Sequence, residues 1–171
     1  MQIFFFSPLL TLILDILAWL VINMGISFLC SRIPDRWLNP QGRFFMASRW
    51  EKEGQIYEQL FHVRTWKQHI PNGGKMFDAN LSLEKLPDRR PESLDHWMKE
   101  SIRAEICHWL LILPGFLFFL WNPYPVGWIM LLFAFLFNIG PVILQRFNRP
   151  RLRKLQRTSH SPDRPNGPLR D

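Results

Sequence analysis

The sequence has few cysteines and lacks the short motifs that mark common soluble enzymes. Its 171 residues include two cysteines, Cys30 and Cys107, which lack metal-ligand spacing and suggest no disulfide framework. There is no glycine-rich phosphate loop, no nucleophile elbow and no paired-cysteine zinc motif. No Lys or Arg precedes Arg32. These absences exclude the familiar P-loop, serine-hydrolase and zinc-site signatures.

Long apolar segments dominate what the sequence contains. The mean hydropathy of -0.07 conceals them, because the polar remainder cancels them in the average. They comprise residues 3–29, 106–120 and 126–144. A helix that crosses a bilayer needs about 20 mostly apolar residues, so the first segment is long enough and the other two are marginal. We expect an all-α integral membrane protein with three transmembrane helices.

The last two apolar segments are expected to form a hairpin. Residues 121–125 connect them with two prolines and no charge, and Trp121, Tyr124 and Trp128 suit a membrane interface. Whether these two helices span fully or form a re-entrant hairpin stays open.

The first segment has an alternative reading as a signal peptide, but it lacks a basic leader, and Arg32 follows it closely.

Basic residues predict the orientation. Residues 30–105 contain thirteen Lys and Arg and residues 145–171 contain eight, whereas the N-terminus and the 121–127 turn contain none. The positive-inside rule then places the N-terminus outside and the central region and C-terminus in the cytoplasm of a multi-pass plasma-membrane protein. The net charge of +7 fits this topology and anionic headgroups. No motif supports nucleic-acid binding.

The central region, residues 30–105, is expected to lie against the cytoplasmic face of the membrane. An amphipathic helix is expected roughly over residues 51–61, with Glu51, Lys52 and Glu53 facing water. Another helix is expected to begin at Pro91 and to continue into the second span. Pro150 is expected to end the third helix nearby. Residues 145–171 then form a basic tail, disordered after about residue 157.

Glu105 and His108 carry the strongest indication of chemistry. They stand three residues apart on one helix face at the edge of an apolar run, where ionisable groups are costly and often functional. His108 is the candidate general base, because imidazole can accept a proton from a hydroxyl group, and Glu105 is its candidate orienter. The alternative is a structural pair that joins helices. Di-iron bundles need two Glu-x-x-His motifs and this chain has one, so no metal is expected.

Arg146, Asn148 and Arg149 form a second candidate site, after the third span. Arginine can hold a phosphate or carboxylate through paired hydrogen bonds, and the hairpin returns this cluster to the side of Glu105 and His108. Membrane anchoring is the alternative, and it is the preferred reading for the neighbouring Arg151, Arg153 and Lys154.

Arg64, Trp66 and Lys67 form a lesser candidate site in the central region. A tryptophan beside basic residues can pack against an acyl chain and a phosphate. Interfacial anchoring alone predicts the same residue types.

Several stretches carry a recognisable pattern: Arg32-Ile33-Pro34-Asp35, residues 61–67 (Phe-His-Val-Arg-Thr-Trp-Lys), residues 103–109 (Arg-Ala-Glu-Ile-Cys-His-Trp), and Asn138 followed by residues 145–152 (Gln-Arg-Phe-Asn-Arg-Pro-Arg-Leu). Together they resemble one family, the glycosyl-diaponeurosporenoate acyltransferases of staphyloxanthin-type carotenoid biosynthesis. The resemblance covers roughly residues 20–155. Asp15, the loop at 75–95 and the proline-rich end depart from it, and acceptor choice could reside in that loop.

The resemblance implies transfer of a fatty acyl group to the sugar of a glycosylated carotenoid. We therefore expect a membrane O-acyltransferase that uses a thioester donor, acyl-CoA as co-substrate, and a sugar hydroxyl of that carotenoid or a related glycolipid. His108 would deprotonate the hydroxyl, while Arg146, Asn148 and Arg149 would bind donor phosphate or the developing oxyanion. The alternatives are a noncatalytic membrane partner or assembly protein of a lipid or carotenoid pathway, and a metal-dependent lipid oxidase.

Overall fold

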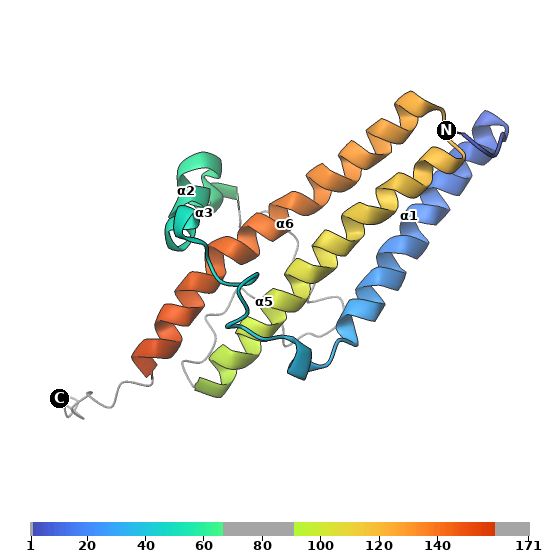
Figure 1. The fold of residues 1–171 in the computed structure, drawn as a ribbon. Helices are drawn as coiled ribbons and strands as arrows, with labels where there is room; N and C mark the ends of the chain where they lie inside the picture. Colours follow the sequence, from blue (N-terminus) through green and yellow to red (C-terminus); the bar gives the residue numbers. More distant parts are fainter. Residues whose placement is uncertain (1, 67–90, 160–171) are drawn as a thin grey trace, which may run out of the picture.

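The computed structural model describes residues 2–66 and 91–159 (Figure 1). Within these residues the protein is helical and contains no strand, and three of its helices are long and apolar enough to cross a membrane. The prediction of an all-α membrane protein with three spanning helices is therefore confirmed. Residues 75–90 of the expected loop at 75–95 lie outside the described residues. So does the end of the chain after residue 159.

The three long helices lie side by side. They are α1 (Pro8–Ser31), α5 (Pro91–Ile112), which continues as the 3₁₀ helix η4 (Leu113–Leu120), and α6 (Tyr124–Ser159). α5 lies between α1 and α6 (Figure 1). As expected, the helix that begins at Pro91 runs on into the second apolar segment. The 36 residues of α6 span about 54 Å, which exceeds a hydrocarbon core of about 30 Å, so its basic half projects beyond that core.

The end of the bundle that carries the N-terminus is held by local caps and close packing. Ser7 caps α1 by accepting a hydrogen bond from Leu10 N at 3.4 Å, and Pro8 occupies the first helical position. The preceding residues Ile3 and Phe4 donate their backbone N–H groups to Leu120 O. This contact holds the N-terminal residues beside the 121–123 turn.

Most large apolar side chains of α1 face outward. Only Asp15 and Cys30 are buried along this helix, while Leu9, Val21 and Leu29 are each two-thirds exposed or more. A helix that is apolar all round belongs in lipid or a large core, and the bundle offers no such core here. Asp15 is compensated by Trp121 Nε1 at 2.7 Å and Asn122 Nδ2 at 2.8 Å, both of which donate to its carboxylate.

The central segment packs on the basic half of α6. It contains two 3₁₀ helices, η1 (Asp35–Trp37) and η2 (Arg49–Gly54), followed by α2 (Gln55–Phe61) and α3 (Val63–Trp66). Its buried residues join α6 in one apolar cluster, which consists of Tyr57, Val63, Ile143, Leu144 and Phe147. Figure 1 shows α2 and α3 beside α6, on the opposite side from α5.

Two local expectations were wrong. The single amphipathic helix expected over 51–61 is broken, because Lys52, Glu53 and Gly54 all adopt positive φ. The third helix does not end near Pro150 but continues to Ser159 with Pro141 and Pro150 inside it. Tertiary contacts on both sides of Pro150 outweigh its local preference: Arg149 binds Ser101 and the carbonyl of Phe45, and Arg153 donates to Pro40 O.

Candidate functional site

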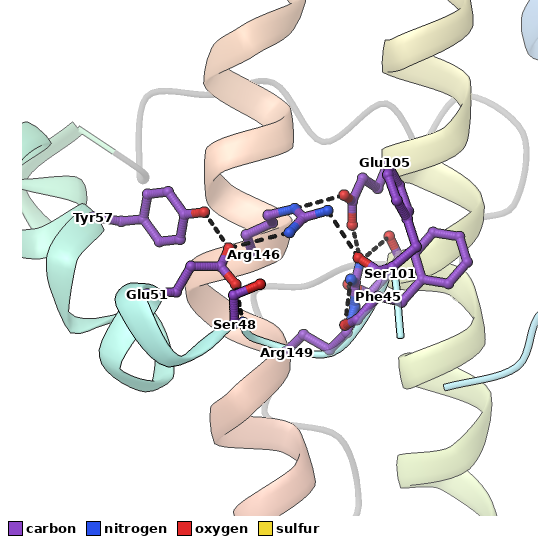
Figure 2. A network of polar contacts seen from close by, with 9 residues as sticks. Phe45, Ser48, Glu51, Tyr57, Ser101, Glu105, Arg146 and Arg149 are labelled. Carbon is purple, nitrogen blue, oxygen red and sulfur yellow. Dashed lines mark hydrogen bonds and ion pairs between the residues drawn. The ribbon is translucent and has the colours of Figure 1, made fainter. Parts of the chain in front are cut away.

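A buried ionic network joins the central segment to α5 and α6 (Figure 2). It consists of Glu51 from η2, Glu105 from α5, and Arg146 and Arg149 from α6. Two of its members come from one helix and the other two from segments far apart in the sequence. The network therefore exists only when all three segments have docked.

Arg146 is the centre of the network. Its Nε donates to Glu105 Oε1 at 2.7 Å, and its Nη1 donates to Glu51 Oε1 at 3.1 Å. The remaining nitrogen, Nη2, donates to Phe44 O at 3.0 Å. The guanidinium also lies over the Phe44 ring, 5.3 Å from its centroid. All three nitrogens of this side chain are thus engaged within the protein.

Arg149 is bound in the same way, one helical turn later. Nη2 lies 2.6 Å from Glu105 Oε2, an ion pair without the alignment of a hydrogen bond, since Glu105 Oε2 accepts none from the described residues. The guanidinium donates to Ser101 Oγ at 3.3 Å, Ser101 O at 3.1 Å and Phe45 O at 3.1 Å. Arg149 thereby fixes the central segment to α5 and α6.

The network balances two carboxylates against two guanidiniums. Glu51 is 1% exposed and Glu105 is fully buried, and unpaired charges at such positions are strongly destabilising. Both carboxylates can therefore be buried only because the two guanidiniums pair with them. The expectation that Glu51 faces water was wrong, because the positive-φ residues after it turn the chain and aim its side chain at α6.

Hydrogen bonds determine the charge state of Glu51. Burial alone would raise the pKa of its carboxyl, but hydrogen bonds from the Tyr57 hydroxyl, the Ser48 N–H and Arg146 outweigh burial and hold that pKa below its ordinary value. Burial, and then the bond and charge of Glu51, raise the pKa of Tyr57. At neutral pH Glu51 is therefore ionised and the Tyr57 hydroxyl donates to it.

His108 lies one turn further along α5 and has a different partner. Its Nδ1 lies 2.9 Å from Asn138 Oδ1, while the Asn138 amide nitrogen donates to Ala134 O at 2.8 Å. Because that amide donor is already used, Asn138 presents its oxygen to His108, and Nδ1 must carry the hydrogen. A neutral His108 then has an unprotonated Nε2 that can accept a proton.

The structure thus separates the two residues that the sequence paired. Glu105 points toward Arg146 and Arg149 across the α5–α6 interface, whereas the ring of His108 is oriented by Asn138. Among the described residues, no hydrogen bond or ion pair joins Glu105 to His108. What the structure brings together instead is Glu105 with two of the three residues of the second candidate site.

The remaining predicted site residues lie around this network. Asn148 is half-buried on α6, and its side chain makes no hydrogen bond within residues 2–66 and 91–159. Trp66 donates from Nε1 to Phe61 O at 2.7 Å and packs against the α2–α6 cluster. Arg64 is exposed on α3. Lys67 lies outside the described residues.

Sequence reasoning gave no role to Glu51, Tyr57, Ser101 or Asn138. The sequence did hint at Asn138, because burying an amide within an apolar run costs free energy unless the amide is hydrogen-bonded. In the part of the chain that the structure describes, no three His, Cys, Asp or Glu side chains converge in a way that could hold a metal ion.

Comparison with known proteins identifies a family. The family model described as glycosyl-4,4'-diaponeurosporenoate acyltransferase matches residues 35–158, which include the ionic network, His108 and Asn138. The enzyme of that name from Staphylococcus aureus strain MRSA252 is 33% identical over 139 residues, which cover 81% of this chain and 84% of the relative. Those of strains USA300 and Newman are 32% identical over the same lengths.

No solved structure matches this chain. The family match, which covers more than half of the chain, confirms the resemblance found in the sequence. The chain therefore belongs to the family of glycosyl-4,4'-diaponeurosporenoate acyltransferases and is an acyltransferase.

Proposed function

We propose that this protein transfers a fatty acyl group from a thioester donor, acyl-CoA, to a sugar hydroxyl of a glycosylated carotenoid or related membrane glycolipid. The family and the names of the relatives support the acyltransferase reaction and the acceptor class. They favour this reading over a noncatalytic membrane partner. The apolar faces of the three helices suit an acceptor that is dissolved in the bilayer.

The observation that carries the mechanism is the hydrogen bond between His108 and Asn138. It places the hydrogen of a neutral ring on Nδ1 and leaves Nε2 free, which is the tautomer that a general base acting through Nε2 requires. In the proposed reaction, Nε2 takes the proton of the sugar hydroxyl as its oxygen attacks the thioester carbonyl. The carbon–sulfur bond then breaks, and the thiolate receives the proton from the imidazolium. The products are the sugar ester and the free thiol of the donor.

The ionic network has a positioning role in this proposal. The guanidiniums of Arg146 and Arg149 are engaged by Glu51, Glu105 and backbone carbonyls, so a substrate phosphate would have to displace those partners. We assign these residues to holding the central segment beside His108. Asn148, whose side chain makes no hydrogen bond within the described residues, is a predicted substrate contact.

The orientation of the protein is part of the same proposal. The basic half of α6 and the central segment lie at one end of the bundle, and the N-terminus lies at the other (Figure 1). The positive-inside rule supports a plasma-membrane protein with its N-terminus outside and the basic end in the cytoplasm. That end would then face the compartment that supplies acyl-CoA.

Substitution of His108 tests the reaction. The protein is purified in nanodiscs and supplied with acyl-CoA and a glycosylated carotenoid, and the ester product is quantified by mass spectrometry. His108→Ala should lower the rate about 10²- to 10⁴-fold. His96→Ala, which removes an exposed histidine from the same helix, should leave the rate unchanged.

Two results would argue against the proposal. Transfer by His108→Ala at the wild-type rate would remove His108 from the mechanism. If the inserted wild-type protein transfers no acyl group to any extracted glycolipid, the noncatalytic partner becomes the better reading.

A further inference from the structure

A second polar site lies outside the ionic network, on the other side of α6. α2, α3 and the basic half of α6 border an open groove of about 370 Å³. This volume lies within the range of small-molecule sites, roughly 300–1,000 Å³. Its lining is almost entirely polar or charged and consists of Glu53, Gln55, Glu58, Gln59, Arg64, Pro150, Arg151 and Lys154.

Three cations meet in this groove. Arg64 comes from α3, and Arg151 and Lys154 come from α6. Unlike Arg146 and Arg149, none of the three forms an ion pair with a carboxylate among the described residues. Their charges are therefore available to an incoming anion.

Arg151 is held in place without losing its charge. It donates from Nη1 to Phe147 O, and its guanidinium carbon lies 3.5 Å from the centroid of the Phe147 ring. A guanidinium positioned in this way loses less conformational freedom when it binds a phosphate. Arg64 is anchored through its backbone, because its N–H donates to Glu58 Oε2 at 3.0 Å.

Two carboxylates give the groove a mixed character. Glu53 and Glu58 would repel a bare polyanion, but they can accept hydrogen bonds from hydroxyl or amino groups. Gln55 and Gln59 can both donate and accept. The lining therefore fits a ligand that combines phosphate with sugar hydroxyls and amines, as a nucleotide does.

We infer that this groove binds a phosphate-bearing ligand through Arg64, Arg151 and Lys154. This inference rests on the proposed function, in which the ligand is the nucleotide end of the acyl-CoA donor. Arg151 follows Asn138 by thirteen residues, which is about 20 Å along α6. A donor that reaches from the groove to His108 needs a long flexible arm between its phosphates and its thioester, and acyl-CoA has one. An anionic lipid headgroup shares the phosphate chemistry and is the other source.

Calorimetric titration with coenzyme A tests the groove without any acyl transfer. The full-length protein is studied in nanodiscs of neutral phosphatidylcholine. Arg151→Gln and Lys154→Gln should each weaken binding about tenfold, because each removes one charge-assisted contact. Wild-type affinity should also fall as salt rises. Arg43→Gln, which removes an exposed charge outside the groove, should bind as the wild type does.

A variant of opposite effect separates binding from damage to the fold. Glu53→Gln removes a negative charge from the groove and should tighten coenzyme A binding, whereas general destabilisation would weaken it. Arg151→Lys keeps the charge and should retain most of the affinity. If all groove variants bind coenzyme A and phosphatidylglycerol as the wild type does, the inference is overturned.

Further arms identify the source of the phosphate and separate this inference from the proposed function. If phosphatidylglycerol nanodiscs abolish coenzyme A binding and the groove variants lose their preference for that lipid, the ligand is a headgroup. If the ligand is the donor, the KM for acyl-CoA rises in the variants while kcat holds. If the wild type transfers acyl groups but the groove variants keep its KM for acyl-CoA and its affinity for coenzyme A, only the donor site is refuted. If the groove variants lose coenzyme A binding but the wild type transfers no acyl group, only the acyltransferase proposal is refuted.

Discussion

Arg146 and Glu105 form a direct link between the last two long helices. Arg146 Nε donates to Glu105 Oε1 at 2.7 Å, and the carboxylate is fully buried. The same guanidinium reaches Glu51 in the central segment at 3.1 Å. One side chain therefore defines the relative placement of three segments, and several of its consequences can be measured.

Removal of the Arg146 charge should destabilise the protein. Arg146→Gln leaves Glu51 without its cation and Glu105 with Arg149 alone, a change that we expect to lower the free energy of unfolding by about 3–5 kcal/mol. Chemical unfolding in mixed micelles measures it. Arg43→Gln, an exposed control, should stay within about 0.5 kcal/mol of the wild type.

A double variant tests the cause of that loss. Glu51→Gln combined with Arg146→Gln restores the charge balance, because Glu105 and Arg149 remain paired. It should be more stable than Arg146→Gln alone. Simple additivity of the two single effects would contradict the network as described.

Stability should depend on pH through Glu51. The folded protein holds the pKa of Glu51 below its ordinary value of 4.5, so this carboxylate stabilises the fold above about pH 4.5. That contribution is lost as the pH falls through the lower folded-state pKa. Melting temperatures of wild type and Glu51→Gln should therefore converge at acid pH. Glu53→Gln, an exposed neighbour, should keep the wild-type pH dependence.

Gly54 should not tolerate a side chain. Its φ is +84°, and an added Cβ would lie 3.2 Å from Phe147 O and 3.3 Å from Arg146 O. Gly54→Ala should therefore lower the free energy of unfolding by about 1–3 kcal/mol. Gly25→Ala, within α1 and with open space around it, should cause no loss in the same unfolding measurement.

Asn138 should set the tautomer of His108. Asn138→Ala removes the acceptor for Nδ1–H, so ¹⁵N NMR of His108 should change from one tautomer to a mixture. We expect kcat for acyl transfer to fall about tenfold with KM unchanged. Asn23→Ala removes an amide that donates to Trp19 O within its own helix, and it should alter neither quantity. A wild-type tautomer in Asn138→Ala would contradict this role.

The sequence was informative where structure depends on neighbouring residues. The three apolar segments, the uncharged turn at 121–125 and the continuous helix from Pro91 into the second apolar segment are local patterns. Each corresponds to a helix or a connection in the structure. The family resemblance also rested on continuous stretches and was confirmed by comparison. Local hydrophobicity decides these features, because each helix satisfies its own backbone hydrogen bonds in a membrane.

Only the tertiary structure decided which side chains meet. Helical spacing placed Glu105 and His108 on one face, but the packing of α5 against α6 gave Glu105 two arginines and His108 an asparagine. The turn at residues 52–54 buried Glu51, which a regular helix would have exposed. Contacts on both sides also outweighed the helix-breaking preference of Pro150. These outcomes depend on helix register and on charges far apart in the chain, which local propensity does not encode.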